Sequence, residues 1–145
     1  MVLVLEHDED GALGVVLNEP LEIEARGLLP GWDERIAGPA VVFRGGPVQP
    51  EVAIGVGATD DGPPLVVDLE SDGPGITRMR LFSGYSGWGP SQLDGELASH
   101  DWLVVPAEPD DAFTGDPWAL WREVVERLDG DGALLATLPM DPRLN

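Results

Sequence analysis

The sequence predicts a single α+β domain in which helices pack against a mixed, strongly curved sheet. A chain of 145 residues is the size of one domain, and an apolar content of 43% is sufficient for a hydrophobic core. Short apolar runs typical of strands recur along the chain, and one clear amphipathic helix pattern lies near its end. Strands and helices do not alternate regularly, so a doubly wound parallel sheet is disfavoured.

The first predicted element is a hairpin. Residues 2–5 are continuously apolar, as in a strand covered on both faces, and residues 13–17 form the predicted partner strand. Asp10-Gly11 is a common turn dipeptide, and it lies in a loop that is longer than the tight two-residue type. Residues 21–36 are interrupted by glycine and proline, and there we expect a short helix and a loop.

Four further apolar runs predict a meander of strands, separated by turns rich in glycine, proline and aspartate. In the last run, Arg78 and Arg80 alternate with apolar residues, so we expect both arginines on a face of the strand that is in water. The four runs are residues 40–43, 52–56, 65–69 and 78–81.

A glycine-rich segment follows and is the most distinctive stretch of the sequence. We expect the chain to leave its strand at Phe82, to turn at glycines around Tyr85 and Trp88, and to begin a short helix over residues 92–99. Another strand is predicted over residues 102–105. Such a corner either nucleates packing or forms the wall of a pocket.

The clearest predicted helix covers residues 116–128. Asp116 is a suitable N-cap and Pro117 suits the first helical position. Glu123 and Arg127 are expected to pair at i,i+4 on the outer face. Gly130 is expected to end the helix. The apolar stripe expected to face the core is Trp118, Trp121, Val125 and Leu128.

The charge of the chain limits the classes of function. Eight arginines and no lysine face 27 acidic residues, which gives a net charge of −19. This charge disfavours direct binding of nucleic acids, because it repels phosphate backbones. The lack of lysine and cysteine excludes Schiff-base and thiolate chemistry and cysteine-ligated zinc. No apolar run approaches the about 20 residues of a membrane span, and we expect a soluble, cytoplasmic protein without a cofactor.

Functional side chains concentrate at the predicted loops, where binding residues tend to lie. We therefore predict that the first hairpin loop, the Gly45-Gly46 turn and the glycine-rich corner meet at a cleft that binds a protein or a small ligand. The candidate cleft residues are Glu6, His7, Asn18, Gly45, Gly46, Tyr85, Trp88, Gln92 and Glu96.

Other interpretations of the same residues stay open. The glycines also suit tight turns that have no ligand, and Gln92 and Glu96 also suit a solvated helix face. No residue is assigned as catalytic and no metal site is assigned, although Glu6, His7 and Asp8 are weak candidates for metal ligands. The alternative function is therefore a metal-assisted hydrolase that uses this loop together with Glu96.

Several motifs in the same order resemble the bacterial YqgE/AlgH family. They run nearly from end to end of the chain. They are Leu5-Glu6-His7-Asp8, residues 11–18 with Pro20, Gly45-Gly46-Pro47-Val48, Gly84-Tyr85-Ser86-Gly87-Trp88-Gly89-Pro90 with Gln92, Leu93 and Glu96, Trp102-Leu103-Val104, Phe113, Leu120-Trp121 and Pro142-Arg143-Leu144-Asn145.

The resemblance implies one domain over residues 1–145 whose sheet forms a pseudo-barrel with flanking helices. It implies no established biochemical activity and no catalytic set. Some members are labelled as transcriptional regulators, and here we expect any such regulation to be indirect, through a protein or a small ligand. The chain departs from the family pattern in its start, where an N-terminal segment is missing before Leu3 and the sheet is expected to have an open edge, and in Glu19, where arginine is common.

Overall fold

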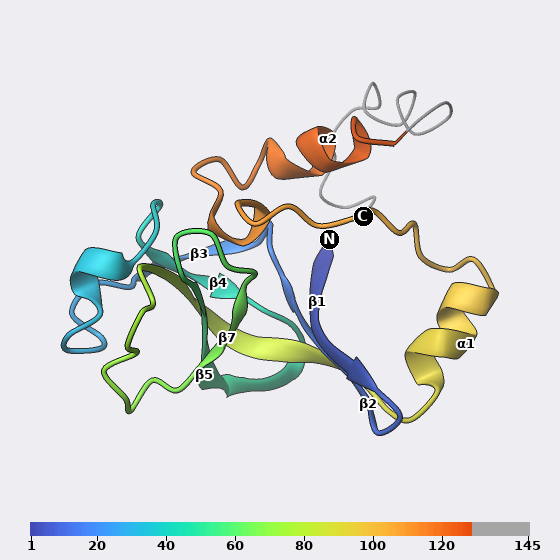
Figure 1. Ribbon diagram of the computed structural model, residues 1–145, viewed down its shortest axis with the longest axis horizontal. Coiled ribbons are helices and arrows are strands. Elements are labelled where there is room, and N and C mark those ends of the chain that lie inside the picture. Colours follow the sequence, from blue (N-terminus) through green and yellow to red (C-terminus); the bar gives the residue numbers. More distant parts are fainter. Residues whose placement is uncertain (129–145) are drawn as a thin grey trace.

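The structure is a computed structural model that describes residues 1–128 (Figure 1). Within these residues the chain forms a seven-stranded mixed sheet with few helices, which confirms the α+β class. The elements are β1 (Val2–Asp8), β2 (Gly11–Val16), β3 (Pro20–Glu24), η1 (Asp33–Arg35), β4 (Val41–Arg44), β5 (Val48–Ala58), β6 (Leu65–Val67), β7 (Arg78–Trp88), α1 (Gln92–Ala98), η2 (Asp111–Phe113) and α2 (Leu120–Val125).

Strand β7 is the centre of the sheet. It pairs antiparallel with β5 along one edge, and along the other edge it pairs first with β4 and then with β2. The β4 pairing is parallel, with Phe43 opposite Phe82, so the predicted simple meander is wrong. The hydrogen-bonded path runs β1-β2-β7-β4-β3, and among residues 1–128 no pairing joins β1 to β3. The strong curvature and the pseudo-barrel stay predictions.

The glycines allow backbones to approach closely around the middle of β7. The amide of Gly45 donates to the carbonyl of Ser83 at 2.9 Å, and Ser86 Oγ donates to the carbonyl of Gly45 at 3.2 Å. A Cβ at Gly45 would overlap the carbonyl oxygen of Gly84, and one at Gly46 would overlap the carbonyl of Tyr85. Strand β7 continues to Trp88, with a local irregularity at Gly84, whose φ is 70°, so the end of the strand predicted at Phe82 is wrong.

The core lies on both sides of the sheet in two clusters. One joins Phe43 and Phe82, whose rings meet edge to face at a centroid distance of 6.0 Å, to Phe113 and Leu120 from the C-terminal part. The other is formed around Trp32 and Met79, with the residues Ala25, Ile36, Val42, Val67 and Leu81. Phe113 and Leu120 therefore fasten the segment after α1 onto the sheet.

Arg80 is buried, contrary to the expectation that it faces water. Only 1% of it is exposed, and its guanidinium donates to the carbonyls of Gly38 at 2.6 Å, Ala112 at 3.1 Å and Thr114 at 3.0 Å. It also lies over the ring of Phe43, at 4.3 Å from the centroid. Burial lowers the pKa of Arg80 to about 10. The segment around η2 covers this face of the sheet, which the local pattern of alternation does not reveal.

Three other predicted elements need correction. Residues 21–36 begin as strand β3, which pairs with β4 and was not predicted, and a loop and the short 3-10 helix η1 follow it. Residues 102–105 form no strand. The late helix is confined to α2, although Asp116 Oδ1 does accept the amide of Ala119 at 3.1 Å. Gly130 and the closing motif 142–145 lie outside the described residues.

The side chains of the late helix also differ from the prediction. Trp118 is 66% exposed and does not belong to the core. Arg127 pairs with Asp111 through two hydrogen bonds and lies 3.4 Å from a carboxylate oxygen of Glu108, instead of forming the predicted ion pair with Glu123. Among the described residues, no helix is long and apolar enough to cross a membrane.

After β7 the chain leaves the sheet. It forms α1 beside the β1–β2 hairpin and returns past the start of β1 to η2 and α2 (Figure 1). This returning connection, residues 99–110, and the two helices form a partial second layer over β1. The candidate site lies between this partial layer and β1.

Candidate functional site

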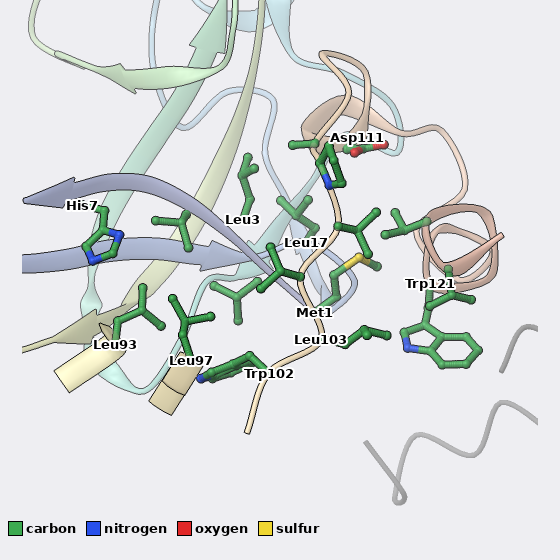
Figure 2. Close-up of a pocket in the computed structure, with 18 of the residues that line it drawn as sticks. Met1, Leu3, His7, Leu17, Leu93, Leu97, Trp102, Leu103, Asp111 and Trp121 are labelled. Atoms are coloured by element: carbon green, nitrogen blue, oxygen red, sulfur yellow. The ribbon is translucent and has the colours of Figure 1, made fainter. Parts of the chain in front are cut away.

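An apolar groove with a volume of about 550 Å³ lies between β1, α1, the connection and α2. Figure 2 shows side chains from these four elements pointing toward one space, with His7 and Leu93 at one end and Trp121 at the other. Four of the wall residues are large apolar residues that are well exposed, namely Val4 at 43%, Trp102 at 41%, Leu103 at 59% and Val104 at 65%. The wall is formed by Met1, Val2, Leu3, Val4, His7, Leu17, Trp88, Leu93, Leu97, Trp102, Leu103, Val104, Val105, Pro106, Ala107, Asp111, Trp121, Val124 and Val125.

Strand β1 forms the first wall of the groove, and its residues 2–5 are the continuously apolar run described above. β1 pairs with β2 from Val2 opposite Val16 to Asp8 opposite Gly11, with an irregularity between Val4 and Glu6. Leu3 packs into the core below, while Val4 stays largely open to the groove. Strand β1 is thus a terminal strand of the described sheet and one side of the cavity at the same time.

Trp88 and Trp102 line the groove near α1, and their indoles share one carboxylate acceptor, that of Glu96, which does not line the groove. Glu96 Oε2 accepts the indole N–H of Trp88 at 2.9 Å and that of Trp102 at 2.8 Å, and Oε1 accepts the amide of Gln92 at 3.3 Å. The two indole rings meet edge to face at a centroid distance of 6.1 Å. The hydrogen bond from Trp102, followed by the one from Trp88, lowers the pKa of Glu96, so the carboxylate is charged at neutral pH.

His7 joins β1 to α1 at the same end. Its Nε2 lies 3.0 Å from Oδ1 of Asp94, which precedes Glu96 by two positions on the helix. His7 also contributes to the groove wall. The sequence pointed to His7, but not to Asp94 or Trp102. These residues were missed because their contacts cross between elements, and Trp102 was assigned to a strand.

Of the nine predicted cleft residues, His7 and Trp88 line the groove, and Gln92 and Glu96 are linked to Trp88 by hydrogen bonds without lining it. The others lie elsewhere. Glu6 is adjacent to His7 on a regular part of β1, so its side chain points to the opposite face. Asn18 Oδ1 accepts a hydrogen bond from the amino nitrogen of Met1 at 3.2 Å. Gly45 and Gly46 are buried against β7, and Tyr85 lies beside Gly87, on the face of the strand opposite to Trp88.

The geometry gives no support to a metal centre in the first hairpin. In the part of the chain that the structure describes, no group of three His, Asp or Glu side chains could hold a metal ion. Glu6, His7 and Asp8 are consecutive on a strand, so their side chains alternate between its faces and do not converge. The ligand set required by the alternative hydrolase is therefore not assembled.

A smaller polar hollow of about 400 Å³ lies behind η2. Its main feature is the pair formed by Asp111 and Arg127, with one hydrogen bond of 2.7 Å. Burial by itself would raise the pKa of Asp111, but hydrogen bonds from Arg127 and from the amide of Glu108, together with the positive charge of Arg127, lower the pKa overall. This pair holds the chain just after α2 against η2 and has a structural role.

Comparison with known proteins identifies the family. The AlgH-like family model matches residues 1–133. A UPF0301 protein of Streptomyces avermitilis is 43% identical, with 100% of this chain and 85% of the relative covered. A UPF0301 protein of Thermobifida fusca is 37% identical, with the same coverage of the two chains.

Two solved structures share the fold. The crystal structure of a Corynebacterium diphtheriae protein has a TM-score of 0.83 and 28% identity, and it covers 94% of this chain and 81% of that chain. The solution structure of AlgH from Pseudomonas aeruginosa has a TM-score of 0.65 and 22% identity, with 97% and 84% covered. The chain belongs to the AlgH-like family, in agreement with the resemblance of its motifs to YqgE/AlgH proteins.

Proposed function

We propose that this protein is a non-enzymatic binding module that holds an apolar ligand in the groove and acts in regulation indirectly, as a cytoplasmic protein. The observation that carries the proposal is the groove itself, about 550 Å³ in volume and lined almost entirely by apolar side chains. A contiguous apolar surface that is left open costs free energy in water, and on soluble proteins it commonly marks a site of interaction.

The polar groups at the groove are arranged for recognition instead of for bond cleavage. Glu96 is engaged by three donors, and His7 pairs with Asp94. Ser86, the serine within the glycine-rich motif, donates to a backbone carbonyl inside the sheet. No nucleophile of the described chain is paired with a histidine base in the groove, so a role in binding accounts for these groups more simply than catalysis does.

The charge distribution supports indirect regulation. The net charge is −19, and several of the few cations are already engaged with the protein. Arg35 and Arg80 donate to backbone carbonyls, and Arg78 and Arg127 pair with aspartates. Little positive charge is therefore left for a phosphate backbone. A partner or ligand in the groove provides a route that needs no contact with nucleic acid.

Binding of the neutral fluorescent probe N-phenyl-1-naphthylamine to the full chain tests the proposal. We expect saturable binding with a blue-shifted emission. Leu103→Asn places an amide in the groove and should raise the Kd of the probe about tenfold, because about 1.4 kcal/mol of apolar contact is lost. Leu28→Asn is the matched control, since Leu28 is similarly exposed, at 53%, but does not line the groove.

Either of two results would overturn the proposal. If the probe does not bind, or if the two asparagine variants weaken binding equally, the groove is not a binding site for apolar ligands. Circular dichroism of both variants should match that of the unaltered chain, which separates loss of binding from loss of fold.

A further inference from the structure

We propose that residues 102–107 form a strap that detaches from α1 while the sheet stays folded, and that the carboxylate of Glu96 is the latch that holds the strap in place. The strap contributes one wall of the groove. The inference rests on the proposed function in one respect, since detachment of this wall would let a ligand enter and leave. It follows from the way in which the two ends of the strap are fastened.

The upstream end of the strap is fastened at a single oxygen atom. Glu96 Oε2 accepts the indole N–H of Trp102 at 2.8 Å, and the same atom accepts the indole N–H of Trp88 at 2.9 Å. Trp102 is the first residue of the strap, Trp88 is the last residue of β7, and Glu96 belongs to α1. One side chain therefore joins the central strand, the helix and the strap.

The charge of Glu96 gives the latch its strength. The hydrogen bond from Trp102, followed by the one from Trp88, lowers the pKa of Glu96, so both indoles donate to an ionised acceptor. Such hydrogen bonds are about twice as strong as those between neutral groups. Gln92 orients the carboxylate from within α1, because it donates to Oε1 at 3.3 Å and accepts the amide of Gly89 at 3.0 Å. Removal of the charge, with the shape kept, is therefore sufficient to weaken the latch.

The downstream end of the strap is fastened without the latch. Glu108, the residue directly after the strap, donates its amide to Oδ2 of Asp111 at 2.9 Å, and Arg127 donates to the same oxygen at 2.7 Å. Arg80 holds residues 112–114 against the sheet. Release at the upstream end therefore leaves the chain attached at η2, which is the expected hinge.

The middle of the strap differs in burial from the helix that precedes it. Leu103 is 59% exposed and Val104 is 65% exposed, whereas Leu93 of α1 is only 6% exposed. Side chains that keep most of their surface in water gain little from packing, so a segment made of them opens at a lower free energy than the core. Helix α1 keeps Leu93 and the contact between His7 and Asp94 when Trp102 leaves.

Proteolysis of the full chain by elastase under native conditions, with mass spectrometry of the fragments, tests the inference. Elastase cleaves after small apolar residues, and the strap contains Val104, Val105 and Ala107. Glu96→Gln keeps the shape of the latch and removes its charge, and Trp102→Phe keeps a ring and removes the N–H. Each substitution should raise the rate of cleavage within the strap about fivefold, because this rate follows the population of the open form.

A double variant shows whether the two residues act as one latch. Both substitutions break the same hydrogen bond, so the double variant should be cleaved no faster than the faster single variant. The urea midpoint of each variant should equal that of the unaltered chain, since the sheet stays folded. Glu51→Gln, at an exposed position of β5, and Trp118→Phe, 66% exposed, are the matched controls and should leave cleavage of the strap unchanged.

Three results would overturn the inference. They are unchanged cleavage in the two single variants, effects that multiply in the double variant, and cleavage that rises only as far as the urea stability falls. These measurements need no ligand, so they are independent of the naphthylamine probe. If the strap opens as expected and the probe does not bind, the proposed function alone fails. If the probe binds and cleavage is unchanged, this inference alone fails.

Discussion

The sheet around β7 is closely packed, whereas the apolar groove is open. In the sheet, Gly45 and Gly46 lie so close to β7 that neither position has room for a single Cβ atom. In the groove, large side chains such as Leu103 line a space of about 550 Å³ and remain exposed. In this chain the glycines of the motifs make backbone contacts within the sheet, whereas the tryptophans of the motifs, Trp88 and Trp102, line the groove.

Strand β7 and the residues after it show this division along one stretch of sequence. Around Gly84 the strand contacts the Gly45-Gly46 turn. At its end, Trp88 reaches the groove and donates to Glu96 of α1. A substitution near Gly84 is therefore expected to affect stability, and one near Glu96 to affect recognition.

The largest effect is expected for Gly45→Ala. The new methyl group would overlap the carbonyl oxygen of Gly84, which belongs to the backbone and cannot move away without breaking strand pairing. We expect a loss of about 3 kcal/mol in the free energy of unfolding, measured by urea denaturation. Gly95→Ala is the matched control: a Cβ there has no neighbour within 4 Å, and in helix α1 it should stabilise by about 0.5–1 kcal/mol. Equal stability of the Gly45→Ala variant and the unaltered chain would contradict the comparison.

An intermediate effect is expected for Asp111→Asn, which removes the carboxylate that pairs with Arg127 behind the groove. The loss of hydrogen bonds to a charged partner should cost about 2 kcal/mol at pH 7. Because the pKa of Asp111 is lower in the folded chain, its contribution is present above the unfolded pKa of about 3.9 and is lost as the pH falls through the folded value.

Urea denaturation at several pH values measures this contribution. The stability difference between the unaltered chain and Asp111→Asn should shrink as the pH falls below about 4, whereas Asp61→Asn, at an exposed turn, should show little difference at any pH. A difference that does not change with pH would show that Asp111 contributes by packing, and not through its charge.

The smallest effect on stability is expected for Leu103→Asn, the variant that weakens binding of the apolar probe. Leu103 is mostly exposed, so its removal should change the free energy of unfolding by no more than about 0.5 kcal/mol. Thermal melting without ligand gives this value directly. A loss near that of Gly45→Ala would mean that the groove wall is part of the core, and the contrast between the two regions would disappear.

Local patterns were sufficient to predict much of the sheet. The first hairpin, β4 and α1 follow from apolar runs and turn residues. Asp116 accepts the amide of Ala119 in the turn before α2, but it is not the N-cap of that helix, contrary to the prediction. The length of β7 could not be predicted, because its glycines suit a turn as well as a close approach between backbones. The second interpretation depends on residues 45 and 46, which are distant in the sequence.

The site was predicted only in part, for a related physical reason. The i,i+4 spacing of Gln92 and Glu96 indicated a shared helix face, and the structure places Trp88 on that face. Trp102 and Asp94 acquire their roles through contacts between elements, and a local pattern contains no signal for these. Arg80 was misjudged in the same way, since the segment that buries it lies more than 30 residues further along the chain.

Arg80 also has a consequence for how this family can diversify. Its guanidinium binds three main-chain oxygens on two separate segments, an arrangement that a planar fork can satisfy and a lysine cannot. Arg80 thereby holds residues 112–114 against the sheet. Residues 99–107, upstream, are held mainly by the hydrogen bond from Trp102 to Glu96 of α1. Insertions and deletions in that upstream stretch would resize the groove without disturbing the sheet, so one scaffold can serve ligands of different length.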